Sequence, residues 1–285
     1  MKIRFVSGVW LAFLAAFLWS TGGVGIKLLS LDGLQISAFR AFFAAAALVP
    51  FFRLRDIRWN YNLIGFLISF AVMTSTFVIA TKLTTAANAI ALQYTSVFWV
   101  FLIHELPRLK KFPKEKIVPF VFVLLGILSY LSEPNTGTNV LGNIIALTSG
   151  LAFGLVAVFL KRISVSNGAG IVCLANLFSF IVLFSIIGFS VPSFEKPVFT
   201  ISILFYLGAV QISAAYFIFN KALKTVSALT GSFVALLEPV LNPIWVYFVL
   251  RETPTFQGII GWICLMAGVV TYLMKQGNNN PTKAV

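Results

Sequence analysis

The sequence predicts an all-α integral membrane protein with ten transmembrane helices, arranged as two inverted five-helix repeats. Three observations predict this fold class. Hydrophobic residues make up 59% of the 285 residues and charged residues only 10%, whereas a soluble protein of this length needs far more charge on its surface. Ten apolar segments are long enough to cross a bilayer. Two of them, at corresponding places in the two halves, end on the same pattern Gly-x-x-x-Tyr-Leu, at Gly126–Leu131 and Gly268–Leu273, as an internal duplication would leave.

The spans follow from the apolar segments taken in order along the chain. A helix needs roughly 20 apolar residues to cross the hydrocarbon core of a bilayer, and the polar stretches between the segments are short. The predicted spans cover residues 8–29, 33–52, 62–81, 84–104, 115–132, 141–160, 169–189, 200–219, 227–249 and 255–274. No room for a soluble domain remains.

The distribution of Lys and Arg orients these spans. A formal net charge of +13 would also suit a nucleic-acid-binding protein. With the N-terminus in the cytoplasm, however, sixteen of the 21 Lys and Arg residues fall on the cytoplasmic side, Arg40 falls within a span, and only Lys27, Lys82, Lys196 and Arg251 fall outside. This is the positive-inside bias of membrane proteins. The charge therefore predicts a multi-pass protein of the inner (plasma) membrane with both termini cytoplasmic, and it gives no reason to expect nucleic acid as a partner.

The duplication extends through the whole chain. Residues 8–30 align without gaps on residues 142–164, which pairs Lys27 with Lys161. Because each half has an odd number of spans, the second copy enters the bilayer upside down, and inverted repeats are typical of secondary transporters. We therefore expect a first five-helix repeat over residues 1–137, a second over residues 138–276 and a disordered cytoplasmic tail over residues 277–285.

Arg40 is one of two ionisable residues well inside the predicted spans, where a charge is expensive. It lies about two helical turns from the external end of its span. A guanidinium there is stable beside a watery cavity or a carboxylate, and either would suit recognition of an anionic substrate group. The alternative is a side chain that extends outward to the interface and anchors the helix.

Glu238 is the second and deeper ionisable residue, at the middle of the span 227–249, and it is followed by Pro239 and Pro243. Proline removes a backbone donor, so we expect this helix to be kinked. A kinked helix that bears a carboxylate at the bilayer midplane is a candidate proton or substrate site. The alternative is a neutral, structural Glu that forms a hydrogen bond between helices.

Polar and aromatic side chains at similar depth are candidates to complete a substrate cavity, because small-molecule sites combine apolar walls with a few directed polar groups. For a single polar residue, hydrogen bonding between helices is the alternative. Together with Glu238 and Arg40, the predicted substrate-binding residues are Trp19, Gln93, Tyr216 and Asn242.

No pattern in the chain predicts catalysis, a metal or a cofactor. There is one His, and the two Cys residues, Cys173 and Cys264, lie in apolar spans without His or Cys at metal-ligand spacing. Nucleophilic triads, phosphate-binding loops and dinucleotide-binding glycine patterns are absent from the sequence. We therefore expect neither an enzyme nor ATP-driven transport by this chain alone.

Four stretches of the sequence carry a resemblance to a known family: Phe17–Gly22, Phe39–Ala41, Leu236–Val240 and Arg251–Pro254. On these the chain resembles the EamA-type members of the drug/metabolite transporter superfamily. The resemblance implies two inverted five-helix repeats, cytoplasmic termini and a central cavity. Members of the family move amino acids, nucleobases, metabolites and drugs, often by proton exchange. The chain departs from the family at Gln93–Val97, where the first repeat usually has a proline, so we expect no symmetric kink in that span.

Together these observations predict a secondary active transporter of a small polar metabolite, with amino-acid-like export, that works by alternating access around a mid-membrane cavity. The expected partners are the small-molecule substrate, the lipid bilayer and, as a candidate coupling ion, the proton. The sequence leaves open whether the protein forms a homodimer. Two alternatives also stay open at this point: import of a scarce metabolite, and a membrane-embedded enzyme that acts on lipid-linked substrates.

Overall fold

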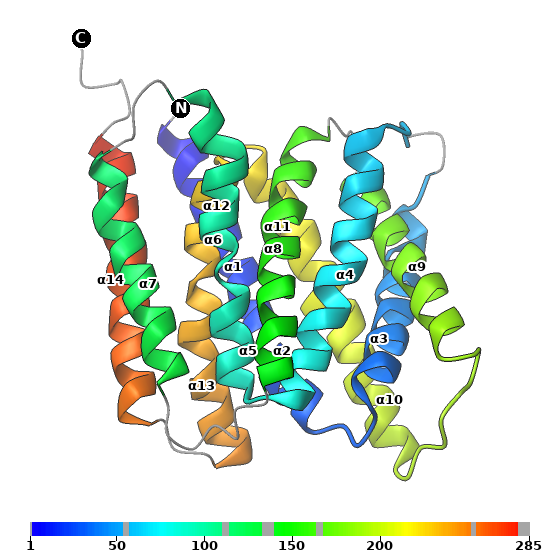
Figure 1. Cartoon of the computed structure of the whole chain (residues 1–285). Coiled ribbons are helices and arrows are strands. Elements are labelled where there is room, and N and C mark those ends of the chain that lie inside the picture. The colour runs from blue at the N-terminus through cyan, green and yellow to red at the C-terminus, as the bar shows by residue number, and fades with distance from the viewer. Residues whose placement is uncertain are drawn as a thin grey trace.

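The structure, a computed structural model, describes residues 2–53, 57–109, 114–132, 140–163, 168–251 and 255–278. Over these residues the chain is helical, without β-strands. The helices form one bundle, and the start of the first helix and the end of the last lie at the same face (Figure 1). The predicted all-α membrane fold is confirmed.

Within the described residues the bundle contains ten helical stretches that correspond to the predicted spans, five in each half of the chain, and several of them consist of two or three consecutive helical segments. The first five are α1 (Lys2–Ser20) with α2 (Gly22–Lys27), α3 (Gly33–Leu48) with η1 (Val49–Phe51), α4 (Tyr61–Leu83), α5 (Ala86–Gln93) with α6 (Ser96–Val100) and η3 (Phe101–Glu105), and α7 (Ile117–Leu131). The last five are α8 (Val140–Arg162), α9 (Gly168–Ile186), α10 (Pro197–Phe205) with η6 (Tyr206–Ala214) and α11 (Ala215–Leu223), α12 (Ala228–Ala235) with α13 (Leu237–Leu250), and α14 (Phe256–Asn278). We number these spans 1 to 10.

The spans lie where the hydropathy of the sequence predicts them. In the described part of the chain, 9 helical stretches are long and apolar enough to cross a membrane. The remaining span, α7, has only 15 residues and packs along α14. The predicted boundary between residues 137 and 138, and the tail beyond residue 278, lie outside the described residues.

Helix packing repeats itself between the two halves. Helix α1 packs against α11, α12 and α13, and its counterpart α8 packs against α4, α5 and α6. Helices α3 and α9, which occupy equivalent places, pack against each other, as do α7 and α14. Two copies of one five-helix unit, related by an approximate two-fold axis, give this pattern of neighbours.

Two aligned lysines show the inversion in single contacts. At the end of α2, the Lys27 ammonium donates a hydrogen bond to the carbonyl of Thr84, 3.1 Å away, at the residue that ends α4. Near the end of α8, Lys161 donates to the carbonyls of Leu223 and, at 2.9 Å, Val226, where α11 ends. Each lysine thus caps the last carbonyls of the third span in its own repeat. The two caps lie at opposite faces of the bundle (Figure 1).

Candidate functional site

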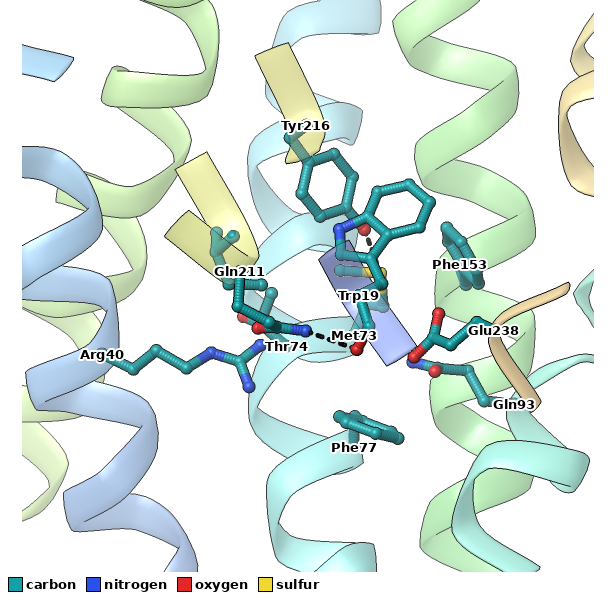
Figure 2. A pocket seen from close by; sticks show the side chains of 11 residues that line it. Trp19, Arg40, Met73, Thr74, Phe77, Gln93, Phe153, Gln211, Tyr216 and Glu238 are labelled. Carbon is teal, nitrogen blue, oxygen red and sulfur yellow. Dashed lines mark hydrogen bonds between the residues drawn. The ribbon is translucent and has the colours of Figure 1, made fainter. Parts of the chain in front are cut away.

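A small cavity lies among eight helical segments of the bundle (Figure 2). It has about 20 Å³ of room for the centres of water-sized molecules, which is enough for about one water. Its lining residues are Trp19, Arg40, Met73, Thr74, Phe77, Gln93, Phe153, Gln211, Ile212, Tyr216 and Glu238.

The cavity brings together most of the residues predicted from the sequence. Arg40, Glu238, Trp19, Gln93 and Tyr216 all line it. The sixth, Asn242, is not a lining residue, and its place is described below. Apolar residues of α4 and α8 form part of the wall and were not predicted, because a phenylalanine or methionine within an apolar span gives no distinguishing signal. For one of them, Phe153, a signal existed: the repeat alignment pairs it with Trp19.

Arg40 reaches the cavity from α3. Its side chain is only 3% exposed, so the alternative in which it extends outward as a surface anchor is wrong. Within the described structure its guanidinium forms no hydrogen bond or ion pair, and its Nη1 is buried. Helix η6 packs closely on this part of α3: a Cβ on Gly208 would lie 2.6 Å from the Arg40 carbonyl oxygen. The backbone that carries the guanidinium is therefore tightly held.

Glu238 reaches the cavity from α13, on the side opposite Arg40, and the two side chains point toward one another (Figure 2). It is 5% exposed and accepts a hydrogen bond from the hydroxyl of Tyr94 with an O···O distance of 2.6 Å. That distance is typical of a hydroxyl bound to a carboxylate. Glu238 thus has the interhelical hydrogen bond of a structural residue and also faces the cavity.

The predicted kink in span 9 is confirmed. The span breaks at Leu236, between α12 and α13, directly before Glu238 and Pro239. Pro243 has no N–H, so it leaves the carbonyl of Pro239 without its helical partner. The hydroxyl of Tyr130, in α7, donates to that carbonyl at 3.2 Å. The tyrosine of the recurring Gly-x-x-x-Tyr-Leu pattern therefore satisfies a group that a proline in the other repeat leaves free.

The prediction that span 4 lacks a corresponding kink is wrong. Helix α5 ends at Gln93 and α6 begins at Ser96, with no proline at the break. The Thr95 hydroxyl donates to the carbonyl of Leu92 at 2.8 Å, a local bond that competes with helical geometry. Helix α8 packs directly on the break, since a Cβ on Gly150 would lie 2.8 Å from the Leu92 carbonyl oxygen. The break in span 4 thus occurs together with local hydrogen bonding and close packing of α8, whereas the break in span 9 occurs beside a proline.

Span 1 is also interrupted, between α1 and α2, and two amide side chains bind the carbonyls before the break. Gln211 Nε2 donates to the carbonyl of Trp19 at 3.1 Å, and Asn242 Nδ2 donates to that of Ser20 at 2.7 Å. Gly23 leaves room for the second amide, because a Cβ there would lie 2.7 Å from Asn242 Nδ2. Asn242 therefore supports the backbone beside the cavity, where the sequence had suggested a lining residue.

Aromatic rings form the wall around Trp19. Its ring centroid lies 4.8 Å from that of Tyr216 and 5.8 Å from that of Phe153. The Tyr216 hydroxyl lies 3.1 Å from the sulfur of Met73. These contacts hold the indole in place, and Figure 2 shows it with Met73 between the Arg40 and Glu238 sides of the cavity.

Several polar atoms of the lining residues have no partner in the structure. They are two donors, Arg40 Nη1 and Trp19 Nε1, and one acceptor, Gln211 Oε1. Gln93, by contrast, already donates to Ser149 Oγ at 2.8 Å. Buried polar groups are normally paired, so the free atoms are suited to a bound molecule that brings both acceptors and a donor. Among the residues described, His, Cys, Asp and Glu form no cluster of three or more that could hold a metal ion.

Comparison with known proteins agrees with this architecture. A model of the EamA-like transporter family matches residues 6–132 and again residues 140–274. A protein of Archaeoglobus fulgidus described as an uncharacterized transporter is 26% identical over 268 residues, covering 90% of this chain and 93% of its own length. A protein of Clostridium kluyveri with the same description is 23% identical over 306 residues, covering 95% and 94%. One crystal structure, 14% identical in sequence, superposes with a TM-score of 0.74 over 96% of this chain and 99% of the other, which is a likeness of fold.

Proposed function

The chain belongs to the EamA-like transporter family, and we propose that it is a secondary active transporter that exports a small, polar, amino-acid-like metabolite. Binding takes place in the cavity between Arg40 and Glu238. The inner (plasma) membrane is the proposed location, with both termini in the cytoplasm, because that orientation puts most of the Lys and Arg residues inside.

The observation that carries the proposal is the buried, unpartnered guanidinium of Arg40. A charged Arg at the centre of a membrane helix costs about 2.5–3.5 kcal/mol even on permissive scales, and this cost is reduced when the charge finds a partner. The carboxylate of a substrate would be such a partner, and it would also accept a hydrogen bond from Trp19 Nε1. An ammonium or other donor on the same substrate suits Glu238 and Gln211 Oε1.

The size of the cavity supports an alternating-access mechanism. About 20 Å³ is far below the roughly 300 Å³ of a typical small-molecule pocket, so a metabolite requires the cavity to widen. Its walls include an Arg40 side (α3, α4, η6 and α11) and a Glu238 side (α5 and α13), with Trp19 of α1 and Phe153 of α8 also lining the cavity. Interruptions in spans 1, 4 and 9 and the π-helical segment η6 give the helices points at which they can bend. Rocking of one side against the other would open the cavity to each face in turn.

Proton coupling is part of the proposal, with Glu238 as the coupling group. It is the carboxyl among the lining residues, and ionisable groups within membrane spans commonly serve as proton relays. A proton on Glu238 and an ammonium beside it would compete for the same oxygens, which would link their movements.

Counterflow in proteoliposomes tests the function. Vesicles loaded with an unlabelled amino acid mixture should accumulate the corresponding radiolabelled amino acid transiently, because exchange through a carrier needs no net gradient. Arg40→Ala should abolish the accumulation. Arg53→Ala, which removes an exposed Arg outside the predicted spans, is the matched control and should leave it intact. Absence of counterflow from the unsubstituted protein with every amino acid, nucleobase and organic acid supplied would refute the proposal.

A further inference from the structure

We propose that Arg40 and Glu238 select the substrate by charge balance: the cavity accepts molecules that carry one anionic and one cationic group and rejects molecules with a single charge. This rests on the proposed transport function, and it names the property by which that site distinguishes substrates.

The first observation is that the cavity is charge-balanced. Arg40 and Glu238 are the charged side chains among the buried residues that the structure describes, and both line the cavity. Around them the wall is apolar or uncharged. When Glu238 is ionised, the cavity holds one positive and one negative charge, at opposite sides (Figure 2).

Each charge retains capacity to bind a ligand group of opposite sign. Arg40 has no partner, and Trp19, whose Nε1 is likewise buried without a partner, lines the same cavity. These two donors suit the two oxygens of a carboxylate. One oxygen of Glu238 accepts from Tyr94, and a carboxylate can accept several further hydrogen bonds. An ammonium fits there.

A molecule with one charge leaves the opposite wall charge uncompensated. A monocarboxylate pairs with Arg40 but brings a second negative charge near Glu238, and an amine does the reverse at Arg40. Water screens such repulsion at a surface, but a cavity with about 20 Å³ of room for water centres holds about one water. A zwitterion pairs with both wall charges and leaves the net charge of the cavity unchanged. Sites that leave a buried polar group unpaired discriminate by about 10²-fold or more.

The two charges also lie on elements that pack with different neighbours. Helix α3, which carries Arg40, packs against α9, η6 and α4, whereas α13, which carries Glu238, packs against α1, α2, α5 and α14. A zwitterion therefore contacts both sides of the cavity, and a singly charged molecule contacts one. Closure around the ligand, the step that precedes reorientation, is favoured only when both contacts form.

A three-compound series tests the selection rule: leucine, its decarboxylated analogue isopentylamine and its deaminated analogue 4-methylpentanoate. The same triplet is prepared for whichever amino acid gives counterflow with the unsubstituted protein. Each compound competes with the labelled amino acid in proteoliposomes. The amino acid should compete at concentrations at least ~100-fold lower than either analogue.

Single substitutions should change which analogue binds, and equilibrium binding of each labelled compound to the purified variant measures this without requiring transport. Glu238→Gln removes the negative charge and should improve binding of the carboxylate analogue at least tenfold relative to the amino acid. Arg40→Gln should do the same for the amine. The variants Glu238→Asp and Arg40→Lys keep each charge and provide a second test if either neutral variant fails to fold. Both should keep the preference for the zwitterion.

Three results would overturn the inference. They are equal competition by all three compounds with the unsubstituted protein, an unchanged order in both neutral variants, and loss of the zwitterion preference in both charge-retaining variants. In each of these the unsubstituted carrier still exchanges amino acid, so the proposed function stands while the selection rule fails. Absence of any exchange by the unsubstituted protein refutes both together.

Discussion

Spans 4 and 9 occupy equivalent places in the two repeats and both break part-way along their length, but only one of them carries a charge at the break. Helices α5 and α12, which precede the breaks, each have 8 residues and each begin after a hydroxyl N-cap. After the break, span 9 continues with Glu238 and Pro239, whereas the equivalent residues of span 4 are Ser96 and Val97. The shared scaffold thus supplies two broken helices, and the sequence places the carboxylate in one.

The first repeat supports the charged break of the second. Tyr94, at the break in span 4, binds the side chain of Glu238, and Tyr130, in span 5, binds the carbonyl of Pro239. Tyr94 also contacts the ring of Phe153 at a centroid distance of 5.8 Å, and Phe153 contacts Trp19. The two repeats therefore contribute different parts of one arrangement. Span 9 carries the carboxylate of Glu238, and spans 4 and 5 supply the tyrosines that hold this part of span 9 in place.

Removing the charge should have the largest effect. Glu238→Ala is expected to reduce transport at least ~100-fold, because it leaves Arg40 without an opposite charge in the cavity and deletes a substrate contact. Ser96→Ala is the matched control at the equivalent place in span 4. The Ser96 hydroxyl is buried and unpartnered, so its loss should change transport by less than about twofold. Initial rates of counterflow compare the two. Equal losses would show that the break, and not the charge, matters.

Removing the support for that charge should have an intermediate effect. Tyr94→Phe keeps the ring and its packing but deletes the donor to Glu238. Hydrogen bonds to charged groups contribute about 1.5–3 kcal/mol, so transport should fall roughly tenfold, or somewhat more. Tyr247→Phe, at an exposed tyrosine that does not line the cavity, is the control and should have a smaller effect. A larger loss in Tyr247→Phe would contradict the positioning role of Tyr94.

The pairing of Tyr130 with the proline-freed carbonyl predicts a coupled effect on stability. Tyr130→Phe leaves the buried carbonyl of Pro239 without its hydroxyl donor and should destabilise the protein by about 1–3 kcal/mol. Pro243→Ala restores an N–H that can serve the same carbonyl, so in that background Tyr130→Phe should cost about 1 kcal/mol less. Thermal unfolding of the four proteins in detergent measures this coupling. Strictly additive effects would mean that the hydroxyl does not act through this carbonyl.

The capping lysines should give the smallest difference between the repeats. Both lysines donate to backbone carbonyls, but Lys161 is partly buried whereas Lys27 is exposed. Lys161→Met should therefore reduce thermal stability more than Lys27→Met, by about 1 kcal/mol or less. The same unfolding assay applies. A greater loss from Lys27→Met would indicate that the cap in the first repeat is the more important one.

The sequence predicted the spans, and it singled out residues of which most line one cavity, because both depend on features that stand out against an apolar background. Arg40 and Glu238 are conspicuous in hydrocarbon, and both line the cavity. The break in span 4 escaped prediction because no residue at that place marks it. It coincides with close packing against Gly150 and with the bond from Tyr94 to Glu238, between residues distant in sequence. Asn242 was misplaced for a related reason: an amide within a span can bind a ligand or a backbone carbonyl, and only the fold decides which.

The central claim is that the cavity between Arg40 and Glu238 binds the substrate. Equilibrium binding to the purified protein in detergent tests it most directly, using as radioligand the amino acid that shows counterflow. We predict that Arg40→Ala weakens binding at least ~100-fold while Arg53→Ala and Ser96→Ala bind as the unsubstituted protein does. Undiminished binding by a folded Arg40→Ala variant would contradict the account, because the substrate would then bind elsewhere.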